Sequence, residues 1–188
     1  MEKNCMSKRI LIPLADGFEE IEAVTVVDIL RRAGADVVTA GLQKRNVTGS
    51  HNLHLVADTV LEECLTETWD AIILPGGVPG TPNLAEDSRL IDLLQKQGAA
   101  NQVTAALCAA PYVLDRAGLT RQKRFTSHPN WVEKIQAGDN TQHRVMIDGN
   151  LITGQAAGSA MEFAFLIVES LFGPETADAV NQGVLARR

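Results

Sequence analysis

Short, continuously apolar segments that stop at turn-forming residues constrain the fold of this chain more than any other feature. AIIL at 71–74 is followed by Pro-Gly-Gly, and VTAAL at 103–107 is followed directly by Cys108. Strands buried on both faces have this pattern, because helices cover both sides of a parallel sheet. The sequence therefore predicts an α/β protein with a mostly parallel central sheet.

Segments with helical periodicity alternate with these strands. In 18–33, apolar residues recur at helical spacing, and Gly34 is typical of a helix C-terminus. Asp148-Gly149 is a hairpin signal between two further apolar segments. The expected strands are 9–15, 36–42, 53–56, 71–74 and 103–107, and the expected helices are 18–33, 88–99, 109–117 and 159–172, with a last helix from Pro174. This alternation predicts a doubly wound sheet with helices on both faces.

Length and charge limit the classes of protein to which the chain can belong. Its 188 residues suit a single domain over 1–188, of which we expect 1–6 to be disordered. A formal net charge of −6 argues against dedicated nucleic-acid binding, which needs a basic face. The sequence shows no signal-peptide pattern and no apolar stretch long enough to cross a bilayer, so we expect a cytoplasmic protein without membrane attachment.

Cys108 stands at a predicted junction between a strand and a helix. A thiol at a helix N-terminus meets backbone N–H groups and the positive end of the helix dipole, and both favour the thiolate. A buried structural cysteine is the alternative, and only the junction favours a reactive thiol. The other cysteines, Cys5 and Cys64, lack such a setting, and three cysteines at wide spacing indicate free thiols.

Three glutamates, Glu19, Glu20 and Glu22, stand near the beginning of the first predicted helix, close to the end of the first strand. Carboxylates in a first helical turn commonly compensate the helix dipole, and we favour this interpretation for Glu19 and Glu20. Glu22 lies in an otherwise apolar region, where burial would raise its pKa and let it donate a proton. The residues alone leave both interpretations of Glu22 open.

His128 is a candidate acid or base, because it lies in the loop pattern TSHPN and precedes a proline. A solvent-facing histidine is the more common outcome for such a position. The other histidines show no metal-ligand spacing to carboxylates or cysteines, so we predict no metal site. These histidines are His51, His54 and His143.

The glycines after the strand at 71–74 allow backbone N–H groups to approach a ligand closely. With the N–H group of Ala109, those of Gly76 and Gly77 would form an oxyanion hole, although a plain turn is the usual interpretation of Pro-Gly-Gly. Ligands of doubly wound sheets bind beyond the carboxyl ends of the strands, where these segments and Cys108 should meet. No glycine fingerprint for nucleotide phosphates is found in the sequence.

A resemblance to a known family is carried by segments that occur in the family's order: LADGFEEIEAVTVVDILRRAGADV, WDAIILPGG, AALCAAP, SHP and GSAMEFAFLIVESLFG. Together they resemble the ThiJ/PfpI superfamily, and within it the branch of the parkinsonism-associated protein deglycase and its bacterial relatives. The likeness extends from Lys8 to Leu185. The resemblance implies a flavodoxin-like fold that forms homodimers.

The resemblance also implies roles within the site. Cys108 matches a nucleophilic, oxidation-sensitive cysteine, Glu22 a protonated glutamate that hydrogen-bonds the cysteine sulfur, and His128 the nearby histidine. The family's oxyanion positions fall on Gly76 or Gly77 and on Ala109. The chemistry that follows needs no cofactor and no metal.

The activity implied is that of a glutathione-independent, cysteine-dependent glyoxalase or deglycase. Its substrates would be methylglyoxal, glyoxal and early glycation adducts of proteins or nucleotides, attacked by the thiolate at an aldehyde or hemithioacetal carbon. The alternative is a redox-sensing or chaperone protein in which oxidised Cys108 is the signal. Loss of turnover in a Cys108→Ala variant would distinguish the enzyme from the alternative.

The sequence departs from the family in two places that bear on the pocket. His51 replaces an arginine beside the site, near the expected dimer contact, and Ala156-Ala157-Gly158 replaces a Gly-Pro-Gly segment behind the cysteine. We therefore assign no catalytic role to His51. The resemblance therefore does not predict the shape of the pocket.

Overall fold

The computed structural model describes residues 7–186, so the expected disorder of 1–6 and the interpretation of Cys5 lie outside the described residues. The strands of the central sheet are β1 (Arg9–Leu14), β2 (Asp36–Gly41), β5 (Thr59–Val60), β6 (Ala71–Leu74), β7 (Val103–Leu107), β10 (Val145–Asp148) and β11 (Leu151–Gly154). The α-helices are α1 (Glu20–Arg32), α2 (Gly80–Glu86), α3 (Ser88–Ala99), α4 (Pro111–Arg116), α5 (Pro129–Val132), α6 (Ala160–Phe172) and α7 (Pro174–Val184). Two small sheets pair β3 (Asn46–Thr48) with β4 (His54–Val56) and β8 (Arg124–Phe125) with β9 (Asp139–Asn140).

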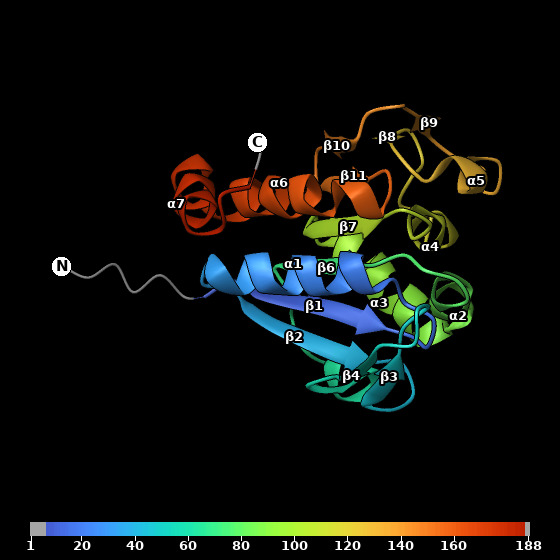
Figure 1. Cartoon of the computed structure of the whole chain (residues 1–188). Helices are drawn as coiled ribbons and strands as arrows, with labels where there is room; N and C mark the ends of the chain where they lie inside the picture. The colour runs from blue at the N-terminus through green and yellow to red at the C-terminus, as the bar shows by residue number, and fades with distance from the viewer. Residues whose placement is uncertain (1–6, 187–188) are drawn as a thin grey trace.

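The central sheet has the strand order β10-β11-β7-β6-β1-β2-β5 (Figure 1). All neighbouring strands are parallel except the edge strand β10, which runs antiparallel to β11. This antiparallel pair confirms the hairpin predicted at Asp148-Gly149. From β1 the chain first adds β2 on one side and later β6, β7 and β11 on the other, so the order reverses between β1 and β6.

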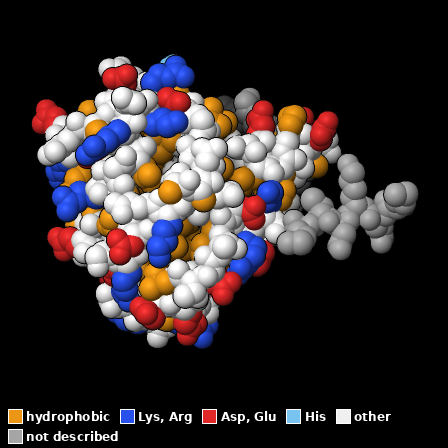
Figure 2. Space-filling model, turned by 180° about the vertical axis from the view of Figure 1, so that it is seen from behind, with side chains coloured by type: hydrophobic (Ala, Val, Ile, Leu, Met, Phe, Trp, Pro, Cys, Tyr) orange, Lys and Arg blue, Asp and Glu red, His pale blue; other side chains and the backbone are white. Residues whose placement is uncertain are grey.

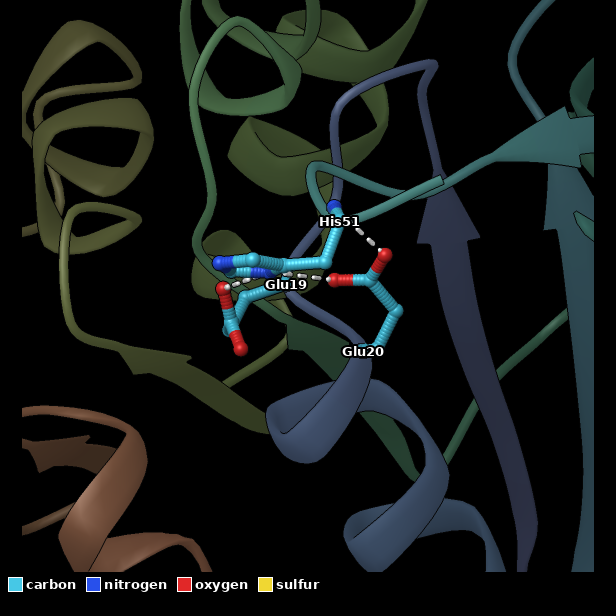
Figure 3. Close-up of side chains that lie close together, drawn as sticks. All are labelled: Glu19, Glu20 and His51. Atoms are coloured by element: carbon cyan, nitrogen blue, oxygen red, sulfur yellow. Dashed lines mark hydrogen bonds and ion pairs between the residues drawn. The ribbon is translucent and has the colours of Figure 1, made fainter. Parts of the chain in front are cut away.

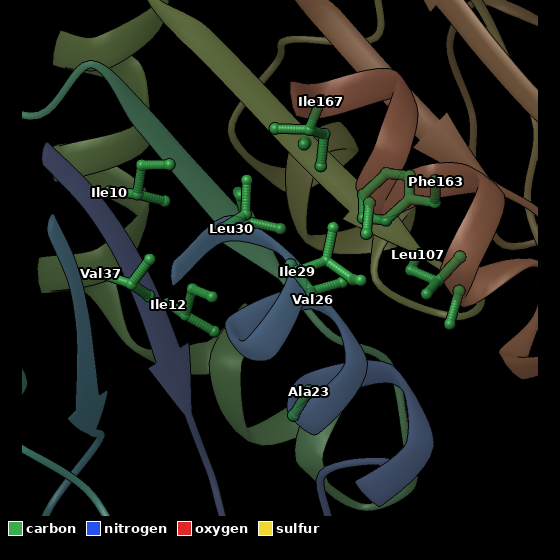
Figure 4. Packing of buried hydrophobic residues seen from close by; sticks show 14 of the residues in the cluster. Ile10, Ile12, Ala23, Val26, Ile29, Leu30, Val37, Leu107, Phe163 and Ile167 are labelled. Atoms are coloured by element: carbon green, nitrogen blue, oxygen red, sulfur yellow. The ribbon is translucent and has the colours of Figure 1, made fainter. Parts of the chain in front are cut away.

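Helices cover both faces of the sheet because alternate residues of each strand point to opposite sides. Ile10 and Ile12 of β1 belong to a core that also contains residues of α1, α6 and α7, part of which is shown in Figure 4. Leu11 belongs to a second core, which contains residues of α3 and α4. The predicted doubly wound, mostly parallel α/β fold is confirmed.

Some predicted boundaries are corrected by the structure. The helices predicted over 18–33 and 109–117 begin two residues later, at Glu20 and Pro111, because turns intervene after β1 and β7. The strand predicted over 53–56 exists as β4, but it pairs with β3 and not with the central sheet. The helix α2 was not predicted, since its sequence GTPNLAE has no clear apolar periodicity.

The surface carries charges of both signs side by side. On the face shown in Figure 2, acidic, basic and apolar side chains are interspersed. Most of the described lysines and arginines form ion pairs, such as Lys8 with Asp70 and Arg31 with Asp58. Within residues 7–186, no helix has both the length and the apolar character needed to cross a membrane.

The turns after β1 and β6 pack directly against each other where the strand order reverses. The N–H group of Glu19 donates to the Gly76 carbonyl over 2.9 Å, and that of Gly80 donates to the Gly17 carbonyl over 3.2 Å. Gly77 has a φ of +102°, and a Cβ there would lie 2.3–2.6 Å from backbone atoms of 17–19. Only glycine therefore fits at this contact.

Replacing Gly77 with alanine is expected to destabilise the protein far more than the same change at Gly34. Gly34 also has a positive φ, +86°, but a Cβ there meets nothing within 4 Å. Gly34→Ala should therefore lower the free energy of unfolding by only about 1–2 kcal/mol. Gly77→Ala must also displace the backbone of 17–19, so it should lower the free energy of unfolding by at least about 3 kcal/mol. Urea unfolding followed by circular dichroism measures both, and equal losses would contradict the packing argument.

Candidate active site

Cys108 occupies a strained backbone turn directly after β7. Its φ of 62° lies in the left-handed region, which non-glycine residues rarely adopt. Its N–H group donates to the Gly154 carbonyl over 2.9 Å. Its own carbonyl accepts from the Ser127 hydroxyl and from the His128 N–H group, each over 2.8 Å. Two distant segments of the chain, at Gly154 and at 127–128, thus hold the turn in place, which is how strain persists at functional sites.

Glu22 lies beside this turn and is completely buried. Its Oε2 atom accepts a hydrogen bond of 2.7 Å from the N–H group of Gly76. A Cβ on Gly76 would lie 2.8 Å from that oxygen and 2.9 Å from the Cβ atom of Cys108. Glycine at this position therefore allows the carboxyl group and the cysteine to come together.

Burial controls the proton affinity of both groups. It raises the pKa of Glu22 to about 7, against the lowering effect of the Gly76 N–H group and of Cys108. Of the two interpretations of Glu22 that the residues left open, the structure thus agrees with a buried carboxyl group of raised pKa. Burial also raises the pKa of the Cys108 thiol, and the charge of Glu22 raises it further, while the Ala109 N–H group lowers it.

The expected lowering of the thiol pKa by a helix N-terminus is therefore wrong for Cys108. The helix α4 begins only at Pro111 and has 6 residues, so its dipole is small and its first turn does not start at the sulfur. Burial outweighs the single N–H group of Ala109. Thiolate formation at Cys108 consequently depends on Glu22, and the two groups titrate as a pair.

His128 reaches the site through its backbone and begins α5 as its N-cap residue. Its Nδ1 atom accepts a hydrogen bond of 3.2 Å from the Asn130 N–H group. A neutral imidazole that accepts at Nδ1 carries its proton on Nε2. In this geometry the half-buried ring can donate a hydrogen bond from Nε2. Its part in catalysis stays a prediction.

One of the predicted oxyanion-hole residues, Gly76, has a different role in the structure. The Gly76 N–H group is occupied by Glu22, so its expected role toward substrate oxygen is replaced by one in holding the carboxyl group. The N–H group of Ala109 lies at the Cys108 sulfur. Gly77 and Ala109 remain the predicted oxyanion positions.

Glu20 holds the loop that contains His51 (Figure 3). Its carboxylate accepts from the N–H groups of His51 over 2.7 Å and Leu53 over 3.3 Å, and it lies 3.0 Å from His51 Nδ1. Although burial opposes ionisation, these hydrogen bonds lower the pKa of Glu20 to about 2, and the bond to Glu20 raises the pKa of His51. Glu20 is therefore a loop anchor, a role that dipole compensation did not predict.

Ligand atoms of Glu19, Glu20 and His51 lie within 4.8 Å of one another. Carboxylate and imidazole groups are metal-ligand types. Here, however, the Glu20 carboxylate accepts backbone N–H groups and lies within hydrogen-bonding distance of Nδ1 of His51. The arrangement is accounted for by a hydrogen-bonded clamp on the loop.

Two residues that hold the cysteine were missed by sequence analysis. Gly154, the last residue of β11, receives the Cys108 N–H group, and Ser127 donates to the Cys108 carbonyl. Their only signals are the glycine that ends an apolar strand and the serine that precedes His128. The Ala156-Ala157-Gly158 segment forms a short 3₁₀ turn, η2 (Ala157–Ser159), just after β11.

Comparisons with known proteins agree with this geometry. The model of the DJ-1/PfpI family matches residues 8–170. Protein DJ-1 homolog A of Arabidopsis thaliana is 42% identical over 179 residues, 94% of this chain and 46% of that protein. The chain spans about half the length of the plant relatives that it matches.

Other relatives match along most of their length. The glutathione-independent glyoxalase DJR-1.2 of Caenorhabditis elegans is 36% identical over 176 residues, 93% of each protein. The crystal structure of Drosophila melanogaster DJ-1beta superposes with a TM-score of 0.94 at 38% identity, covering 97% of this chain and 100% of that one. One conclusion follows from the fold, from the turn at Cys108 with buried Glu22 beside it, and from these matches. The chain belongs to the DJ-1/PfpI family.

Proposed function

We propose that this protein is a cysteine-dependent, glutathione-independent glyoxalase or deglycase. Its substrates would be methylglyoxal, glyoxal and early glycation adducts of proteins or nucleotides. The observation that carries the proposal is the contact between completely buried Glu22 and the strained Cys108 turn. The glyoxalase named among the relatives supports it.

Cys108 and Glu22 together provide a nucleophile and a carboxyl group that accepts and returns its proton. When one proton is shared, transfer from the thiol to Glu22 leaves a thiolate beside a carboxylic acid. The thiolate forms a C–S bond to the aldehyde carbon of methylglyoxal, and Glu22 returns its proton to the carbonyl oxygen, which gives a hemithioacetal and leaves Glu22 as the carboxylate. His128, which carries its proton on Nε2, is suited to donate a hydrogen bond to that oxygen.

The second half of the reaction moves a proton between two carbons. Glu22 as carboxylate removes the proton from the former aldehyde carbon and returns it to the neighbouring carbon, while the hydroxyl proton passes to the neighbouring oxygen. The product is a lactoyl thioester of Cys108. Water then cleaves the C–S bond and releases lactate and the thiol. Methylglyoxal and water are converted to lactic acid without any net redox change, so no cofactor is required.

The working form is proposed to be a homodimer built on the outer side of α1. Ile21 and Val24 stand one helical turn apart and are 58% and 45% exposed, and Leu53 is 51% exposed. Glu20 binds the Leu53 N–H group and thereby joins the loop to the helix. An apolar patch of this kind is suited to a self-complementary contact.

Lactate formation from methylglyoxal without glutathione is expected to disappear in Cys108→Ala, because no other described residue supplies the nucleophile at this turn. In Glu22→Gln the rate of lactate formation should fall about a hundredfold or more, as expected for loss of a general acid–base. Cys64→Ala, which alters the other described cysteine, should retain activity. Lactate is measured enzymatically on variants with native circular dichroism. An inactive wild type, or an active Cys108→Ala, would favour the redox-sensing or chaperone alternative.

Alkylation of Cys108 by iodoacetamide should accelerate as the pH rises through about 7, where Glu22 titrates. Below this pH the pair holds both protons. Above it one proton remains, and the fraction of molecules in which this proton has moved from the sulfur to Glu22 reacts as the thiolate. In Glu22→Gln no carboxylate can take the thiol proton, so the acceleration near pH 7 should be absent. Mass spectrometry of the Cys108 peptide measures the rate, with the exposed Glu175→Gln as control. An acceleration near pH 7 that persists in Glu22→Gln would exclude the shared proton.

The dimer should be weakened by charges in the α1 patch. Ile21→Glu combined with Leu53→Glu is expected to give a monomer in analytical ultracentrifugation, because buried carboxylates would lack partners. Ile147→Glu changes an apolar residue on β10 that is 40% exposed, and it should leave the association state unchanged. A wild-type monomer, or equal behaviour of the two variants, would rule out this interface.

A further inference from the structure

A cavity of about 360 Å³ lies between α2, α4 and α5, outside the Cys108 site. Its walls include Tyr112 and Arg116 from α4, Trp131 from α5, and Lys134 just beyond α5. An adjoining hollow of about 270 Å³ shares Tyr112, Arg116 and Lys134. The first cavity is of the size that small-molecule ligands occupy, roughly 300–1,000 Å³.

Two aromatic rings form one wall of this cavity. The ring centroids of Tyr112 and Trp131 lie 5.5 Å apart and the ring planes are inclined by 53°. The Nζ atom of Lys134 lies 3.9 Å from the Trp131 centroid, so a cation occupies one face of the indole. Both rings are half-buried. The wall thus offers an aromatic surface on which a planar ring can stack.

Arg116 and Lys134 are exposed cations that lack an ion-pair partner within residues 7–186, although most described cations have one. Asp115, beside Arg116, accepts hydrogen bonds from the Thr120 hydroxyl and from the N–H group of Gln136. Two unpaired cations next to an aromatic wall match a ligand with a planar ring and an anionic group. Guanidinium and ammonium groups are the usual protein ligands of phosphate.

We propose that this cavity binds a purine nucleoside monophosphate. The base stacks on the indole of Trp131 with its edge toward Tyr112, whose ring is inclined to the indole. Lys134 moves off the indole face and, together with Arg116, binds the phosphate. Glu86, an exposed carboxylate on the opposite wall, accepts a hydrogen bond from the sugar or the base. A single phosphate fits better than a polyanion, because Glu86 and the net charge of −6 oppose many phosphates. The proposal does not depend on the function of Cys108.

The chain offers a built-in reporter for this site. Of its two tryptophans, Trp69 is buried and donates from Nε1 to the Cys64 carbonyl, whereas Trp131 lines the cavity. AMP is expected to change the tryptophan fluorescence saturably, with a Kd below about 1 mM. Trp131→Phe should abolish the change. Equilibrium dialysis with labelled AMP confirms binding independently in every variant.

Loss of either cation should weaken AMP binding about tenfold, as expected for a hydrogen bond between charged groups. The variants are Arg116→Gln and Lys134→Gln, and Arg121→Gln is the matched control, because Arg121 is exposed and lies outside the cavity. Surface changes of this kind should leave folding intact. Cys108→Ala should bind AMP as the wild type does, whether or not it is catalytically inactive.

Comparison of AMP with adenosine and inorganic phosphate separates the two halves of the site. Each part alone should bind at least about tenfold more weakly than AMP, because each loses one set of contacts. The assignment is overturned if AMP does not bind, if phosphate alone binds as well as AMP, or if Arg121→Gln weakens binding as much as Arg116→Gln. Loss of AMP binding in Cys108→Ala would also overturn it, since the nucleotide would then occupy the cysteine site.

Discussion

The close approach of a buried carboxyl group to a half-buried cysteine is the constraint on which this structure depends. Gly76 makes it possible, because a Cβ there would stand within 3 Å of both the Glu22 carboxylate and the Cys108 side chain. An ionised carboxylate in such surroundings is costly without hydrogen bonds. The fold provides one donor, the Gly76 N–H group, and leaves Oε1 without a partner among the described residues. Burial outweighs this hydrogen bond and the lowering effect of Cys108, so the pKa of Glu22 rises.

The position of the pair follows from the strand order. Because the order reverses between β1 and β6, the turns after these strands meet and pack against each other at the carboxyl edge of the sheet, where ligands of such folds bind. Glu22 enters from α1, which follows β1, and Gly76 from the turn after β6. Cys108 follows the next strand, β7, and its positive φ persists because Gly154, Ser127 and His128 hold both of its peptide groups. The same sheet that forms the core thus fixes the nucleophile.

The sequence predicted what depends on local pattern and missed what depends on contacts between distant segments. Continuous apolar runs such as 71–74 and 103–107 predicted the buried parallel strands, whereas the apolar surroundings of Glu22 were compatible with its burial without requiring it. The pKa of Cys108 could not be predicted in this way, because the neighbouring carboxyl group and the depth of burial are tertiary properties. Nor does any local signal join Glu20 to the loop at His51, since the hydrogen bonds cross about thirty positions of chain. Family resemblance supplied the pairing of Glu22 with Cys108, which spacing alone does not contain.

Glu20 and Glu22 lie two residues apart on α1 and have opposite pKa shifts, so their environments determine their roles. Glu20, held near 2 by hydrogen bonds that outweigh burial, stabilises the fold above its ordinary value of 4.5, and this stability is lost as the pH falls. Glu22 has a raised pKa, so its contribution is full below 4.5 and is lost as the pH rises through about 7, at a cost of about 3 kcal/mol. The fold therefore sacrifices stability at neutral pH to keep a carboxyl group that exchanges its proton there. The same burial that weakens the folded state makes Glu22 able to take a proton from the thiol and return it.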